Sequence, residues 1–140
     1  MIRLTLIPSF FLLFACSTDR ADTISSMNYL QEPIDAACAR NALIDEEGFA
    51  AVTAISKRGG AEQIEATFND DLPLSVIVRR QQDGTGEVSV FARLPADSTP
   101  LTRRKANFAV QTADEVIYRQ CTADGQINPG DGDVIIEAQE

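Results

Sequence analysis

The clearest pattern in the chain is an alternation of apolar and polar residues over three consecutive segments. Glu62–Asn69, Leu74–Gln81 and Glu87–Leu94 repeat with a period of two, and turn-forming residues separate them. This pattern predicts half-buried antiparallel strands. The residues expected to face one core are Ile64, Ala66, Phe68, Leu74, Val76, Val78, Val88, Val90, Ala92 and Leu94.

A fourth strand is indicated just before these three. The pattern of Phe49–Lys57 fits a strand, although its many alanines also fit a helix, and both interpretations stay open at this point. The next four residues include Gly59 and Gly60, which adopt positive φ angles without strain and therefore predict a turn. The sequence thus predicts an antiparallel meander of about four strands.

Two segments with helical spacing flank the meander. In Pro33–Ile44 the apolar residues recur on one side, which also holds Cys38. In the second segment Thr99 is expected to cap a helix that continues to Asp124 with Cys121 on its apolar stripe. A break near Gln111, or a short strand before it, is an alternative.

This order of elements predicts an α+β fold with two layers. A helix followed by a four-stranded meander resembles the cystatin-like arrangement at the level of element order only. A fold of this kind implies no function by itself.

The N-terminus has a different pattern. Arg3 precedes an apolar run that continues to Ala15, which is typical of a secretory signal and shorter than the ~20 residues that span a bilayer. A buried core strand is the alternative. The run ends in Leu13, Phe14, Ala15 and Cys16, which resembles the lipobox of bacterial lipoprotein signal peptides, with Phe14 bulkier than the family's usual residue.

The resemblance implies that Cys16 becomes the first mature residue and carries the lipid. Three acyl chains would then hold the protein on a membrane. Ser17, in place of an aspartate, points to the periplasmic face of the outer membrane, with the inner membrane as the alternative. The expected organisation is a signal peptide (1–15), a flexible tether (16–32), an α+β domain (33–124) and an acidic tail (125–140).

Export changes the interpretation of the cysteines. If Cys16 is lipidated, Cys38 and Cys121 remain as a pair in an oxidising compartment, which predicts a structural disulfide. A redox-active pair is less consistent with their wide spacing, and a metal site needs more ligands than a chain without histidine offers.

Charge and composition exclude several classes of function. The loss of Arg3 leaves 11 basic and 21 acidic residues in the mature chain, a net charge of about −10 that argues against nucleic-acid binding. The absence of histidine removes the common nucleophile pairs. A calcium loop starting at Asp124 fails because Pro129 and Ile135 stand where glycine and glutamate are required. No cofactor, metal or catalytic residue is therefore predicted.

One face of the predicted meander is a candidate for partner binding. Ile77 and Arg79 share the side opposite the valines with Phe91 and Arg93, and the segment from Arg79 to Lys105 has six cations against three acids. This face could meet an anionic partner. The alternative is that the arginines neutralise the acidic tail or simply solvate the sheet.

We expect a lipid-anchored periplasmic binding or scaffold module that contributes to an envelope complex. A periplasmic inhibitor of a lytic enzyme or protease, which would present the loop Gln82–Gly86, is the first alternative. A small hydrolase built on paired carboxylates such as Asp70 and Asp71 is the second.

Overall fold

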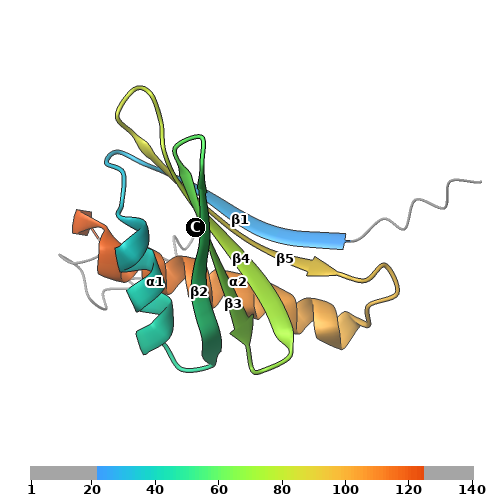
Figure 1. The fold of residues 1–140 in the computed structure, drawn as a ribbon. Helices are drawn as coiled ribbons and strands as arrows, with labels where there is room; N and C mark the ends of the chain where they lie inside the picture. The colour runs from blue at the N-terminus through green and yellow to red at the C-terminus, as the bar shows by residue number, and fades with distance from the viewer. Residues whose placement is uncertain (1–21, 125–140) are drawn as a thin grey trace, which may run out of the picture.

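A five-stranded antiparallel sheet with two helices packed on one face makes up the computed structural model, which describes residues 22–124 (Figure 1). The α+β fold and its single disulfide are confirmed. The elements in chain order are β1 (Asp22–Leu30), α1 (Ala36–Asp45), β2 (Phe49–Arg58), β3 (Ala61–Phe68), β4 (Leu72–Arg80), β5 (Gly86–Leu94) and α2 (Pro100–Cys121).

The strand order is β1-β5-β4-β3-β2. Strands β2 to β5 form the predicted meander, and β1 joins β5 at the opposite edge of the sheet, antiparallel to it. The segment Phe49–Lys57, which fitted both a strand and a helix, is a strand. Its register with β3 shifts twice, and the φ angles of Gly59 and Gly60 in the following turn are 59° and 76°.

Strand β1 corrects the prediction of a flexible tether over residues 16–32. All nine residues from 22 to 30 of that segment pair with residues of β5 in the sheet. The sequence hid this strand because polar residues, Ser26 and Asn28 among them, stand on its helix-facing side. Ser26 and Asn28 both donate hydrogen bonds to Asp114 on α2, Ser26 at 2.9 Å and Asn28 at 2.6 and 2.7 Å.

Capping determines where the helices begin. Helix α1 begins at Ala36, later than the start of the predicted segment Pro33–Ile44, because Asp35 caps the helix by accepting a hydrogen bond from the backbone N–H of Ala37 at 3.0 Å. The N-cap at Thr99 is confirmed, and α2 continues without a break. Near Gln111, where a break was the alternative, Thr112 donates a hydrogen bond to the carbonyl of Phe108 at 2.9 Å.

The core lies between the helices and the valine side of the sheet. Helix α1 packs on β2 and β3, while α2 packs on β1 and β5, so each helix covers about half of that face. Ala39 and Ala42 of α1 are fully buried, as are Ala109 and Ala113 of α2, and small residues of this kind permit close helix packing. The largest side chains that are almost completely buried are Leu43, Ile64, Leu74, Val76, Val90, Val110, Val116 and Ile117.

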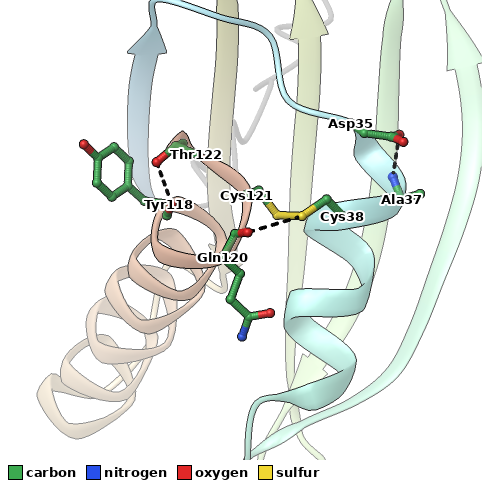
Figure 2. Close-up of a disulfide and its surroundings, with 7 residues drawn as sticks. All are labelled: Asp35, Ala37, Cys38, Tyr118, Gln120, Cys121 and Thr122. Carbon is green, nitrogen blue, oxygen red and sulfur yellow. Dashed lines mark hydrogen bonds between the residues drawn. A yellow bond between two sulfur atoms is a disulfide. The ribbon is translucent and has the colours of Figure 1, made fainter. Parts of the chain in front are cut away.

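The disulfide joins the two helices at one end of this layer (Figure 2). Cys38, in the first turn of α1, is bonded to Cys121, the last residue of α2, and their Cα atoms are 5.8 Å apart. The two residues are 83 positions apart in sequence, so the bridge connects the helix before the meander to the helix after it.

Candidate partner-binding face

The four residues predicted to bind a partner share the face of the sheet opposite the helices, which we call the open face. Ile77 and Arg79 lie on β4, and Phe91 and Arg93 lie on the neighbouring strand β5. Each alternates with a buried residue that faces the helices. Since both helices between residues 22 and 124 pack on the other side, the described part of the chain leaves this face to solvent.

The two arginines lie at opposite ends of the open face. Arg79 is opposite Glu87 in the β4–β5 register, and their side chains are 3.8 Å apart. Arg93 is six residues beyond Glu87 along β5, about 20 Å away at ~3.3 Å per residue. It lies over the ring of Phe91 at 5.8 Å. The arginines therefore do not form one basic patch, because Ile77 and Phe91 lie between them.

Glu87 is buried although it lies on the open face, with only 8% of its surface exposed. Its carboxylate accepts hydrogen bonds from Gln81 at 2.7 Å and from Ser89 at 3.3 Å, in addition to the ion pair with Arg79. These three neighbours supply the donors that a buried carboxylate needs. Much of the charge of Arg79 is thus already balanced within the protein.

Strand β1 adds two exposed apolar side chains that the sequence prediction missed. Met27 lies opposite Ser89 and is 55% exposed, and Tyr29 lies opposite Glu87 and is 72% exposed. Ser89 in turn pairs with Ile77 on β4, so Met27 and Ile77 flank it on both sides. The signal that could have found Met27 and Tyr29 is their spacing of two.

A second carboxylate on the open face is also held by neutral donors. Glu65 of β3 accepts hydrogen bonds from Gln63 at 2.5 Å and from Ser75 of β4 at 2.7 Å. The paired carboxylates at turns have other roles: Asp71 forms an ion pair with Lys105. These contacts connect neighbouring strands and join the β3–β4 turn to α2.

The loop between β4 and β5 extends beyond the helices at the end of the molecule where α2 ends (Figure 1). The carboxylate of Asp83 accepts hydrogen bonds from the hydroxyl of Thr85 at 2.6 Å and from its backbone N–H at 3.0 Å. These bonds, the hydroxyl first, lower the pKa of Asp83 below its ordinary value. The backbone N–H of Gln81 also donates to the carbonyl of Thr85 at 2.9 Å, and Tyr29 and the loop border an open hollow of about 390 Å³.

The residues that the structure describes contain no cluster of three or more cysteine, aspartate or glutamate side chains that could hold a metal ion. Among them, neither helix has the length and apolar character needed to cross a membrane. The predicted lipidation site Cys16, the signal peptide and the acidic tail lie outside the described residues, as does all of the rejected calcium loop except Asp124.

The chain matches no family model, and no curated protein matches it. A crystal structure of protein CV1439 from Chromobacterium violaceum is similar to part of it. The two share 15% sequence identity over 68% of this chain and 94% of the other, with a TM-score of 0.30. This similarity is too weak to inform either fold or function.

Proposed function

We propose that this protein is a lipid-anchored binding module of the bacterial cell envelope that docks a protein partner on the open face. The observation that carries the proposal is the group of apolar side chains there: Met27 and Tyr29 are largely exposed, and Ile77 and Phe91 are partly exposed. Large apolar side chains gathered on one uncovered surface are typical of interaction sites.

The cellular location of the protein is inferred from its cysteines. Leu13 to Cys16 resemble a lipobox, and Cys38 and Cys121 form a disulfide, a bond that persists in the periplasm and is rare in the cytosol. Lipidation of Cys16 would use the third cysteine. Together these features support an anchor on the periplasmic face of the outer membrane.

The chemistry of the open face restricts the partner. Met27 and Ile77 form an apolar centre around Ser89, and Arg93, stacked on Phe91, lies at one side. Met, Arg and aromatic residues are enriched where protein interfaces bind most strongly. A complementary surface would present apolar side chains at its centre and a carboxylate near Arg93.

Photo-crosslinking in intact cells tests this assignment. A benzophenone amino acid at Met27 is expected to give a defined adduct, which Ile77→Glu should reduce at least tenfold by placing a charge in the apolar centre. The matched control is the same amino acid at Phe108, which is 60% exposed on α2. Identical adducts from both positions, or an adduct insensitive to Ile77→Glu, would contradict the proposal.

Lipidation is tested separately. Metabolic labelling with an alkyne palmitate should mark the wild-type protein and leave Cys16→Ser unmarked. An unlabelled wild-type protein would remove the anchor from the proposal and leave the docking face in place.

An inhibitor of a lytic enzyme or protease is the second candidate. The hydrogen bonds within the Gln82–Gly86 loop favour it. Inhibitory loops work best when their bound shape is preorganised, and Asp83 fixes this one through two bonds to Thr85. The mature protein should then inhibit a panel of lysozymes and periplasmic proteases, and Asp83→Ala should weaken inhibition. Absence of inhibition by the wild-type protein would exclude these targets.

A further inference from the structure

The position of β1 shortens the connection between the proposed anchor and the folded domain. The first described residue, Asp22, already pairs with Leu94 at the end of β5. Only six residue steps separate Cys16 from Asp22, and a polypeptide covers at most ~3.5 Å per step. A lipid on Cys16 would therefore keep Asp22 within about 20 Å of the membrane surface.

The start of β1 lies beside the start of α2. Arg103 forms an ion pair with Asp22, and α2 begins only three residues before Arg103. Figure 1 shows the start of β1, the end of β5 and the start of α2 together at the right of the view, with the β4–β5 loop at the other end. We call the end that contains Asp22 and the first turns of α2 the anchor end.

The anchor end exposes an apolar side chain among cations. Leu101, in the first turn of α2, is 71% exposed, and the neighbouring Arg104 is exposed as well. A leucine beside arginines suits the boundary between phospholipid headgroups and acyl chains, where the apolar group enters and the guanidinium stays with the headgroups. Arg103 and Lys105 are paired with Asp22 and Asp71, so their net charge supplies little long-range attraction.

We infer that the anchor end lies against the phospholipid leaflet, with Leu101 at the membrane interface. This rests on the proposed lipid anchor. The short connection raises the local concentration of membrane at Leu101, so contact requires no strong affinity of its own. In this orientation the β4–β5 loop points away from the membrane. The open face is then roughly perpendicular to the membrane plane and accessible from the periplasm.

The chain offers a clean fluorescence test. It has no tryptophan, so Leu101→Trp creates a single fluorophore, and with Cys38 and Cys121 bonded, Cys16 is the one free thiol of the mature chain. The mature protein, starting at Cys16, is coupled through this thiol to a maleimide lipid in vesicles of phosphatidylethanolamine and phosphatidylglycerol. Gln82→Trp, in the β4–β5 loop, is the matched control. Quenching by brominated phospholipid reports contact with the bilayer.

The expected result is at least twofold quenching at position 101 and none at position 82. Equal quenching at both positions, or none at 101, would overturn the inference, and Arg104→Trp repeats the test within the same part of α2. The chemical coupling supplies the anchor whether or not cells lipidate Cys16. Failure here therefore rejects the orientation, while failure of palmitate labelling in cells rejects the anchor.

Discussion

Reduction of the disulfide should remove a large part of the stability of this domain. The bridge between Cys38 and Cys121 closes a loop across 83 positions, and the chain-entropy relation for that length gives about 4 to 5 kcal/mol at 25 °C. The folded state should change little, because Ala39, Ala42 and Leu43 near the bond are fully buried, and this packing should hold α1 in place after reduction. The loss therefore arises in the unfolded chain, which gains freedom. Domains of this size are typically stable by only ~5–15 kcal/mol.

Urea unfolding of the mature chain, followed by circular dichroism, measures this effect. Oxidised and reduced protein are compared in a Cys16→Ser background, which leaves no third thiol to exchange, and Cys38→Ala/Cys121→Ala provides a reference without reductant. The reduced form should unfold at lower urea with a larger dependence on denaturant, since its unfolded chain is more expanded. A loss below about 1 kcal/mol would refute the reasoning, because it would mean that the reduced unfolded chain keeps its ends close together.

Three further predictions concern single side chains. Asp114→Ala should destabilise the domain by about 1.5–3 kcal/mol, since it removes the acceptor of the hydrogen bonds that β1 donates to α2, and it should speed amide exchange in β1. The exposed neighbour Glu115→Ala should change little. Gly86→Ala should lower the free energy of unfolding by about 1–3 kcal/mol and the melting temperature with it, because the added Cβ would lie 2.6 Å from the backbone of the β1–α1 connection. Because the pKa of Asp83 is lowered in the folded protein, its carboxylate stabilises the loop at pH values above the unfolded-state pKa of ~3.9, and this stabilisation is lost as the pH falls through the lower folded-state pKa. In an NMR titration, Thr85→Val should return the pKa of Asp83 towards its ordinary value. An unchanged pKa would contradict the assigned cause.

Strands β3, β4 and β5 were predicted from one property, the alternation of apolar residues that face the helices with more polar residues on the other side. Residues such as Ile64, Val76 and Val90 face the helices and are almost fully buried, so the period of two was visible in the sequence. Strand β1 lacks that pattern because Ser26 and Asn28 occupy the corresponding positions. Their partner, Asp114, is 86 residues from Asn28, and a contact of that range leaves no local trace in the sequence.

The same distinction applies to the candidate site. Alternation along β4 and β5 was sufficient to place Ile77 and Phe91 on one face. It could not show that Arg79 is paired with Glu87, because this depends on the register between the strands and on the donors from Gln81 and Ser89. The alternation of side chains shows which residues share a face, whereas ion pairs within the protein decide which charges on that face remain available to a partner.

The carboxylates of the open face limit which partners can cover it. The carboxylates of Glu65 and Glu87 each accept hydrogen bonds from two or more groups of the protein itself. A partner that displaces water from the remaining acceptor sites of these oxygens without donating a hydrogen bond in its place would make the complex less stable. A uniformly apolar partner surface would impose this cost at both positions. A partner with apolar groups over Met27 and Ile77, and with amide or hydroxyl donors at the two glutamates, avoids it. In the proposed complex the polar positions would contribute specificity, while the apolar centre would supply most of the affinity.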